Sequence, residues 1–341
     1  MDQSGHRHGL FQHICRSYEL VLADGSLVQC SPQSDPELFY SIPWSYGTIG
    51  FLTKVEIEIV PSRRFIRLDY IPVYSLEQLV ETLEGELERS DSPQFVECLV
   101  YSRDQAVVMT GNMVDCCDPD KLNEAGLWHK PWFYKHAQTF FQSGPQTEYL
   151  PLQDYYHRHS RSMFWELEDL IPFGNNVVFR YLAGWLMPPK VSLLKLTQGK
   201  TLKRLYESKH MIQVCKDLSL KLSIKDRLII YHLQDMLVPL TELRNSMELL
   251  DRELELSPIW LCPVKLLARP GLLRSPSSRD EMFVDIGLYG LPQRDHFHSE
   301  KTLRKLEEFV RNIGGFQMMY ADSYMTREEF REMFDHTLYD R

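Results

Sequence analysis

The sequence has no long apolar run and no surplus of positive charge. Of its 341 residues 43% are hydrophobic, yet no uninterrupted apolar stretch reaches the ~20 residues of a membrane-spanning helix. The closest segment, Val177 to Pro189, is interrupted by Arg180. The first residues lack the pattern of a signal peptide. We therefore expect no spanning segment in this chain. The formal net charge is −9, and because phosphate binding needs clustered Lys and Arg, nucleic acid is not an expected partner.

Cysteine is also sparse. The chain has seven cysteines and no CxxC pair, and Cys116 and Cys117 are adjacent, which is poor geometry for a mutual disulfide. This pattern favours reduced thiols that serve as small buried hydrophobic side chains. The spacing of His157 and His159 could suit a metal, but the sequence places no third ligand, so no metal site is expected.

The most informative segment runs from Trp44 to Pro61. A Gly47-Thr48-Ile49-Gly50 turn precedes a predicted strand over residues 51–60, in which apolar and charged side chains alternate. Glycines at such a place let the backbone approach another body, and exposed N–H groups of a turn can hold phosphate or ring oxygens. The alternative is an ordinary loop into an edge strand. Upstream, Asp24-Gly25 between two apolar runs predicts a hairpin.

The rest of the chain predicts an α+β fold. Residues 65–73 indicate a strand, Ser75 and Gln78 a capping box that opens a helix, and residues 95–101 and 106–114 two paired strands. This order is typical of an antiparallel sheet covered by helices on one face. The later half predicts a helix over 240–254, strands over 258–264, 282–289 and 316–321, a helix from Ser299 to Gly314, and a last helix opened by Thr326 and Glu329. The segment 130–195 lacks periodicity and is expected to be irregular.

Several strings resemble a known family. They are Gly9 to Cys15, Tyr18 to Ser26, Trp44 to Leu52, Tyr155-Tyr-His-Arg-His-Ser-Arg-Ser162, Phe164 to Asn176, Pro188 to Gly199, Ile259-Trp-Leu-Cys-Pro263 and Gly315 to Asp335. With them the chain resembles the C-terminal two-thirds of the delta-24-sterol reductases (24-dehydrocholesterol reductases). The likeness runs from about Gly9 almost to the end.

The resemblance implies a flavoprotein of the vanillyl-alcohol-oxidase-like class with a PCMH-type FAD-binding domain. It implies that FAD and NADPH serve the reduction of the side-chain double bond of a sterol such as desmosterol, in cholesterol biosynthesis at the endoplasmic reticulum membrane. Residues 1–62 would be the C-terminal portion of the FAD domain, 63–294 an antiparallel-sheet substrate (cap) domain with flanking helices, and 295–341 a helix, strand and helix that pack back towards the FAD domain.

The chain departs from the family in three places. It starts late, so the glycine-rich loop for the diphosphate has no counterpart, and it stops soon after Tyr339. Residues 214–233 interrupt a segment that the family runs straight from Gln213 into Asp235. These departures leave open whether FAD is retained. The oligomeric state is not predicted.

The implied reaction needs a proton donor, because the alkene is isolated and a hydride completes the reduction. The candidate donors are His157, His159 and Tyr156. The two histidines would share one face of a strand, and the alternative is that they are framework residues. Arg158 would tune the donor or bind a cofactor phosphate.

Other residues would contact the cofactor and the sterol. Residues Gly47, Thr48, Ile49 and Gly50 would contact the flavin, and Phe164, Trp165 and Trp185 would line the sterol pocket, unless these aromatics only pack a core. Two rival functions remain. One is another flavin oxidase of the same class, such as an aldonolactone oxidase or an alkylglycerone-phosphate synthase. The other is a non-catalytic sterol- or partner-binding fragment.

Overall fold

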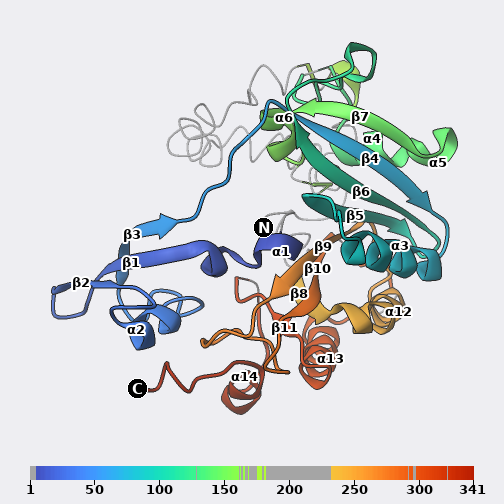
Figure 1. Ribbon diagram of the computed structural model, residues 1–341. Coiled ribbons are helices and arrows are strands. Elements are labelled where there is room, and N and C mark those ends of the chain that lie inside the picture. The colour runs from blue at the N-terminus through green and yellow to red at the C-terminus, as the bar shows by residue number, and fades with distance from the viewer. Residues whose placement is uncertain are drawn as a thin grey trace, which may run out of the picture.

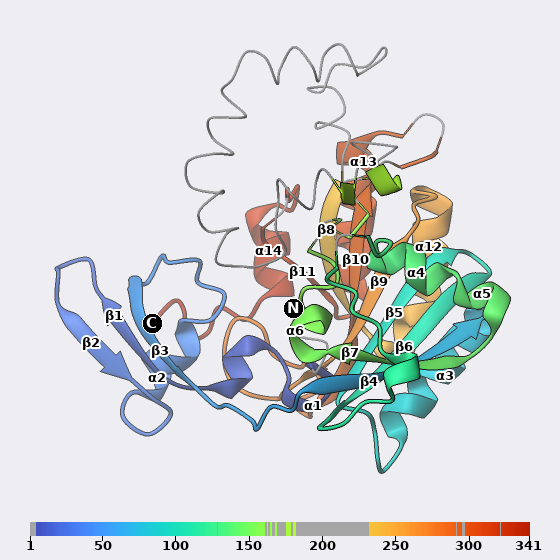
Figure 2. The ribbon, with the colours of Figure 1, turned by 90° about the horizontal axis from the view of Figure 1, so that it is seen from above.

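The computed structural model describes residues 5–127, 129–160, 162, 164–165, 168, 175–178, 180–181, 232–290, 292–294, 297–320 and 322–341. These residues form two antiparallel sheets with flanking helices, which confirms the predicted α+β class (Figures 1 and 2). A three-stranded sheet lies beside a larger sheet of eight strands.

The small sheet has the strand order β2-β1-β3. Helix α1 (Gly5–His8) and the 3-10 helix η1 (Phe11–Ile14) lead into β1 (Cys15–Val21), and β2 (Leu27–Cys30), α2 (Pro36–Ser41) and β3 (Phe51–Ile57) follow. The hairpin expected at Asp24-Gly25 is confirmed, since Val21 pairs with Leu27. Gly25 has φ +83°, which a residue with a Cβ rarely adopts, and Asp24 Oδ1 accepts a 2.9 Å hydrogen bond from Ser26 N.

Strand β3 forms where alternation predicts a strand, but it ends at Ile57 and buries neither of its faces. Phe51 is 74% exposed, and Ile59, beyond the strand end, is 87% exposed. Within the described part of the chain β3 pairs with β1 alone, so it is an edge strand of the small sheet. Phe51, Leu52 and Ile57 therefore lie in solvent, whereas Val55 packs against the core of the small sheet.

The large sheet has the order β11-β8-β10-β9-β5-β6-β4-β7, and every neighbouring pair is antiparallel. Its strands are listed in chain order as β4 (Phe65–Val73), β5 (Phe95–Ser102), β6 (Gln105–Val114), β7 (Gln146–Pro151), β8 (His232–Pro239), β9 (Ile259–Leu266), β10 (Glu281–Gly290) and β11 (Phe316–Gln317). The predicted strands of both halves are thus confirmed, although the strand expected over 316–321 shortens to two residues.

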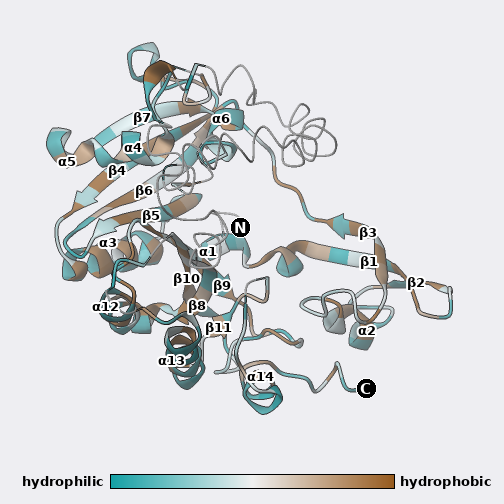
Figure 3. Ribbon diagram, turned by 180° about the vertical axis from the view of Figure 1, so that it is seen from behind, coloured by the Kyte–Doolittle hydropathy of each residue, from teal (hydrophilic) through white to brown (hydrophobic). Residues whose placement is uncertain are grey.

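Helices α3 (Leu76–Glu88), α12 (Leu243–Glu253) and α13 (Ser299–Asn312) cover one face of this sheet (Figure 1). Their buried leucines pack on alternate strand residues such as Val96 and Ile286, while their outer faces are hydrophilic (Figure 3). Short helices α4 (Phe133–Gln138), α5 (Phe140–Ser143) and α6 (Leu152–Tyr156) pack on the opposite face. The 3-10 helices η2 (Pro119–Lys121) and η3 (Leu240–Glu242) complete the connections.

Two helix starts were predicted from capping boxes. At α14 (Arg327–Met333) the box is complete, because Glu329 N donates to Thr326 Oγ1 (3.2 Å) and Thr326 N to Glu329 Oε2 (2.7 Å). At α3 only half of it forms. Ser75 Oγ accepts from Gln78 N (3.1 Å), but Gln78 Oε1 turns to Tyr74 N (2.9 Å).

Sequence reasoning missed several elements. The segment 130–195 was expected to be irregular, yet it contains α4 and β7, and β7 is an edge strand whose mostly polar residues hide the period of two. Strand β8 was also missed. It begins at His232, inside the 214–233 segment that departs from the family, while residues 214–231 lie outside the described part.

The C-terminal segment returns to the small sheet (Figures 1 and 2). The rings of Trp44 and Phe334 lie 5.9 Å apart, Met319 N donates to the Tyr46 hydroxyl (3.2 Å), and the Tyr339 hydroxyl donates to Thr48 Oγ1 (2.6 Å). The residues around the glycine turn therefore lie against the last part of the chain. The division at 62/63 and 294/295 stays a prediction, and β11 is a strand of the large sheet.

Candidate active site

Charged residues interrupt the apolar strands on the sheet face opposite α3, α12 and α13. Along β5, Val96 and Cys98 pack with the helices, so Glu97 between them points to the other side. Its carboxylate is fully buried there. A buried carboxylate is stable only when donors surround it, so its partners define a site.

Three side chains surround the Glu97 carboxylate. Glu97 Oε1 accepts from Arg158 Nε (2.9 Å) and lies 2.6 Å from a second nitrogen of the same guanidinium, while Oε2 accepts from Trp260 Nε1 (3.0 Å) and lies 3.4 Å from His159 Nε2. Burial by itself would raise the pKa of Glu97, but Arg158 and His159 outweigh it and hold that pKa well below its usual value. Glu97 is therefore ionised at neutral pH.

Arg158 is fixed from several sides. It follows α6, its guanidinium donates to the Tyr155 carbonyl (2.6 Å), and it lies 4.0 Å from the centre of the Tyr155 ring. With Glu97 it forms a fully buried ion pair. The predicted contact of Arg158 with a cofactor phosphate would require this pair to open.

The three predicted proton donors do not lie together. Only His159 reaches Glu97, and its ring stacks on Phe164 with centroids 4.5 Å apart. Burial, followed by the charge of Arg158, lowers the pKa of His159, so its imidazole is neutral at pH 7. His157 caps the end of α6, and Tyr156 is 52% exposed.

The strand predicted for His157 and His159 is wrong. Helix α6 ends at Tyr156 and a tight turn follows, so the two histidines share no strand face. The catalytic roles of His157, His159 and Tyr156 stay predictions.

Phe164 is the centre of an aromatic wall. Its ring centroid lies 5.3 Å from that of Trp260, 5.1 Å from that of Tyr289 and 5.7 Å from that of Trp165. Its φ is +60°, a strained value for a bulky residue that persists only when the surroundings impose it. Phe164 and Trp165 therefore lie together in a core cluster, with Phe164 half-buried and Trp165 buried, and their contact with a sterol stays a prediction. Trp185 lies outside the described part of the chain.

A second polar cluster lies on the same sheet face, on β8 and β10. The Tyr289 hydroxyl donates to Asp235 Oδ1 (2.7 Å), and Tyr320 hydrogen-bonds the same carboxylate. Asp285 precedes Tyr289 by two positions on β10, is fully buried, and neither of its carboxylate oxygens has a hydrogen-bond partner among the described residues. Opposite it in register are Cys262 on β9 and Leu237 on β8.

The two carboxyls of this cluster influence each other. Burial, followed by the charge of Asp235, raises the pKa of Asp285 well above its usual value. Burial also raises the pKa of Asp235, and the hydroxyls of Tyr289 and Tyr320 offset part of that effect. Burial therefore favours the neutral form of Asp285.

Sequence reasoning missed Glu97, Asp235 and Asp285. Glu97 and Asp285 are charged residues inside otherwise apolar strand runs, Phe95-Val-Glu-Cys-Leu and Phe283-Val-Asp-Ile-Gly, and Asp235 directly precedes the apolar run Met236-Leu-Val. Such a residue is costly to bury without a reason, and this was the available signal. Their partners are remote in sequence, since 61 positions separate Glu97 from Arg158 and 54 separate Asp235 from Tyr289.

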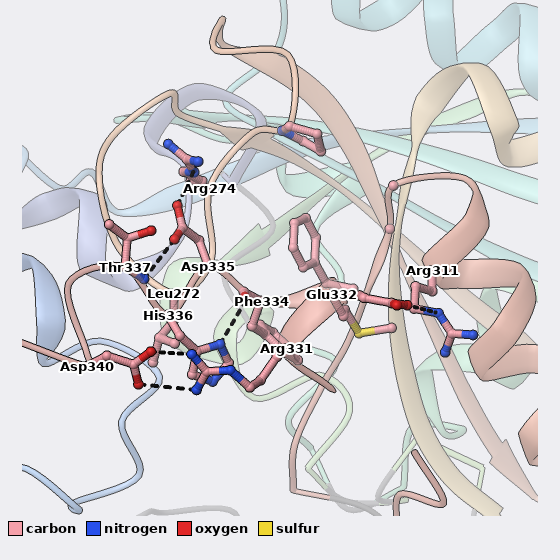
Figure 4. Close-up of a pocket in the computed structure, with 15 residues that line it drawn as sticks. Leu272, Arg274, Arg311, Arg331, Glu332, Phe334, Asp335, His336, Thr337 and Asp340 are labelled. Atoms are coloured by element: carbon pink, nitrogen blue, oxygen red, sulfur yellow. Dashed lines mark hydrogen bonds and ion pairs between the residues drawn. The ribbon is translucent and has the colours of Figure 1, made fainter. Parts of the chain in front are cut away.

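A cavity of about 530 Å³ lies elsewhere, near α14 (Figure 4). Three arginines line it, and each already pairs with a carboxylate: Arg274 with Asp335 (2.7 Å), Arg311 with Glu332 (3.2 Å) and Arg331 with Asp340. An anion would have to compete with these carboxylates. Among the described residues no group of three or more His, Cys, Asp or Glu side chains could hold a metal ion.

Comparison with known proteins relates the chain to one group of enzymes. It is 48% identical over 342 aligned residues to a delta(24)-sterol reductase of Rattus norvegicus, and 37% identical over 370 to that of Arabidopsis thaliana. A homologue from Caenorhabditis elegans is 42% identical over 353. The whole chain aligns in all three cases. This chain is a relative of the delta(24)-sterol reductases.

The chain spans 62% of the length of the rat and plant delta(24)-sterol reductases and 63% of the nematode protein. A putative D-arabinono-1,4-lactone oxidase of Neurospora crassa is 30% identical over 115 residues, which is 34% of this chain and 20% of that protein. No protein-family model matches the chain.

The glycine turn fits a flavin contact in part. Gly47 is exposed at φ +80°, and a Cβ there would meet no atom within 4 Å, so a flat ring could approach its backbone. At Gly50 close packing explains the glycine instead, because a Cβ would lie 2.9 Å from the Val21 carbonyl of β1. Thr48 Oγ1 donates to the Ser45 carbonyl (2.7 Å), and Ile49 is half-buried. Contact of these four residues with FAD stays a prediction.

Proposed function

We propose that this chain supplies the substrate-binding part of a delta(24)-sterol reductase, which reduces the side-chain double bond of a sterol with FAD and NADPH. Similarity to the reductases along the whole of this chain, up to 48% identity, carries the proposal. The aromatic wall around Phe164 supports it, because a rigid tetracyclic sterol needs a broad apolar surface with few polar anchors.

The arrangement on the sheet face suits the reduction of an isolated alkene. A reduced flavin, when bound, supplies a hydride. The chain itself has to hold the sterol side chain, exclude water and deliver one proton. The ring faces of Phe164, Trp165 and Tyr289 would stabilise positive charge that develops on the tertiary carbon, by about 0.5–2 kcal/mol each. The ion pair of Glu97 and Arg158 keeps His159 in place beside this wall.

The same proposal includes a domain arrangement. Residues 1–62 would complete a PCMH-type FAD-binding domain, 63–294 would form the cap, and 295–341 would join the two. The exposed apolar side chains of β3 support it, because such an edge is normally covered by another segment. The flavin would approach the exposed Gly47.

Location at the endoplasmic reticulum membrane is part of the proposal. No described helix combines the length and the apolar character that crossing a membrane requires.

Spectroscopy and product analysis test the function. The purified chain is mixed with FAD, and flavin absorbance is measured after gel filtration. NADPH and a delta-24 sterol are then added, and the product is identified by mass spectrometry. We expect retained flavin and a product heavier by two hydrogens. A sterol with a saturated side chain is the matched control and should consume no NADPH. Absence of both retained flavin and reduced sterol would contradict the proposal.

The uncovered β3 edge also favours a second candidate, a sterol-binding protein without flavin chemistry. In that case the aromatic wall binds sterol while no flavin is retained. Tryptophan fluorescence separates the two, since Trp165 and Trp260 contact Phe164. A sterol-dependent change in a colourless protein would favour the second candidate.

A further inference from the structure

We propose that the open edge of β3 binds the same edge of a second copy of this chain, as an antiparallel strand pair centred on Val55. The inference goes beyond the proposed function, because the pairing needs neither flavin nor sterol. Within the described part of the chain β3 pairs with β1 alone, and all of its residues except Val55 are exposed. An exposed strand edge presents free N–H and C=O groups to any strand that can pair with it.

The backbone of β3 has the orientation that a symmetric pair requires. Glu58 N donates to the Ile14 carbonyl (2.8 Å), which places this N–H on the β1 side. The direction of the N–H groups alternates along a strand, so the N–H and C=O groups of Val55 and Ile57 point to the open edge. Residues 54–57 pair with β1 without interruption, and the extra residue of β3 is Thr53, outside this stretch. A two-fold axis at Val55 therefore gives a hydrogen-bonded pair, in which the Val55 N–H of each copy donates to the Val55 carbonyl of the other.

The charged side chains select this register. Val55 packs against the core of the small sheet, so Lys54 and Glu56 lie on the opposite, exposed face. With the axis at Val55, Lys54 of each copy stands opposite Glu56 of the other, and opposite charges in that position stabilise a strand pair. An axis at Lys54 or at Glu56 would place that residue opposite its own copy, and like charges there are destabilising. The Glu56 carboxylate is held at this face by a hydrogen bond from Ser17 Oγ (3.0 Å).

Apolar side chains flank the two ion pairs. Leu52 and Ile57 are exposed on β3 itself, and Phe51 and Ile59 are exposed at its ends. A second copy would remove part of this apolar surface from water. The edge is thus complementary to itself in hydrogen bonding, charge and apolar character, which makes a second copy the occupant that fits it. One strand pair buries less than the roughly 1,600 Å² of a standard interface, so we expect a weak, concentration-dependent dimer.

Charge reversal tests the register. Sedimentation velocity of the full chain is measured over a range of concentrations, and we expect a monomer–dimer equilibrium. Lys54→Glu and Glu56→Lys should each weaken the dimer about 10–100-fold, because each variant sets like charges opposite one another twice. The matched control is Lys301→Glu on α13, which makes the same charge change at an exposed position and should leave the equilibrium unchanged.

The two variants should also rescue each other. In an equimolar mixture of Lys54→Glu with Glu56→Lys, one strand carries two acidic and the other two basic side chains, so the mixed dimer regains opposite charges. The double variant Lys54→Glu, Glu56→Lys should dimerise like the unmutated chain, because the exchange preserves the complementarity. An unmutated chain that is monomeric at every concentration, or a dimer that neither single variant weakens, overturns the proposal.

Hydrogen exchange shows what covers the edge. The Val55 N–H should exchange slowly in the concentrated, dimeric sample and fast in the dilute one. Slow exchange at every dilution would mean that another segment of the same chain covers β3, and fast exchange in the dimer would mean that the copies meet elsewhere. Either result overturns the proposal. Both assays are run without flavin or sterol, so failure of the proposed function and failure of this inference are seen separately.

Discussion

Replacement of Arg158 by methionine tests whether the Glu97 ion pair holds the sheet face together. The guanidinium supplies two of the contacts to Glu97, at 2.9 Å and 2.6 Å, and both side chains are 1% exposed. Arg158→Met leaves the carboxylate buried with Trp260 and His159 as its partners. Removal of one member of a buried pair typically costs about 3–5 kcal/mol of unfolding free energy, because the other charge is left uncompensated.

Urea unfolding followed by tryptophan fluorescence at pH 7 measures this loss. The matched control is Arg16→Met, which breaks the exposed pair with Glu58 and should cost less than about 1 kcal/mol. The double variant Glu97→Met, Arg158→Met should cost less than the sum of the single variants, with a coupling of about 0.5–3 kcal/mol.

The pH dependence follows from the pKa of Glu97. In the native protein this pKa lies below its unfolded value of about 4.3, so the pair contributes stability above that pH and loses it as pH falls further. Without Arg158, burial raises the same pKa, and Glu97 takes up a proton at a higher pH. The stability gap between the unmutated chain and Arg158→Met should therefore narrow from pH 7 to pH 5. A single-variant cost below about 1 kcal/mol, or a gap independent of pH, would refute the reasoning.

Three further predictions concern local structure. Thr326→Ala removes the cap of α14 and should cost about 0.5–2 kcal/mol in urea unfolding, whereas an unchanged midpoint would mean that the helix start does not depend on the cap. Gly9→Ala forces a Cβ into the His13 ring at φ +75° and should lower the thermal midpoint, which an unaltered melting curve would disprove. Phe51→Ser with Ile59→Ser should change stability by no more than about 0.5 kcal/mol while it reduces self-association in sedimentation velocity, and a large loss of stability would show that these side chains are covered.

Much of the local structure follows from the order of residues alone. Asp24-Gly25 forms a hairpin turn because glycine adopts positive φ without a steric cost. The Asp24 carboxylate also accepts a hydrogen bond from the backbone N–H of Ser26. Thr326 and Glu329 start α14 because each satisfies the backbone N–H of the other. The strings around Tyr155 and Trp44 pointed to the same group of proteins to which the comparison relates this chain, at 48% identity to the rat delta(24)-sterol reductase. In the hairpin and the helix cap the interacting groups are only a few positions apart, and the resemblance is read directly from the order of the residues.

The active-site candidates depend on contacts between distant positions. Glu97 is buried because β5 lies next to β9 in the sheet, which brings Trp260 to it across 163 positions, and α6 places Arg158 above both. Asp235 and Asp285 come to lie on the same sheet face of neighbouring strands only because β8 pairs with β10. Strand order and register are set by the packing of the whole core, since a slip of one residue would turn each carboxyl to the helix side. Local propensity carries no information about that choice, so the tertiary structure alone decided which charges became buried partners.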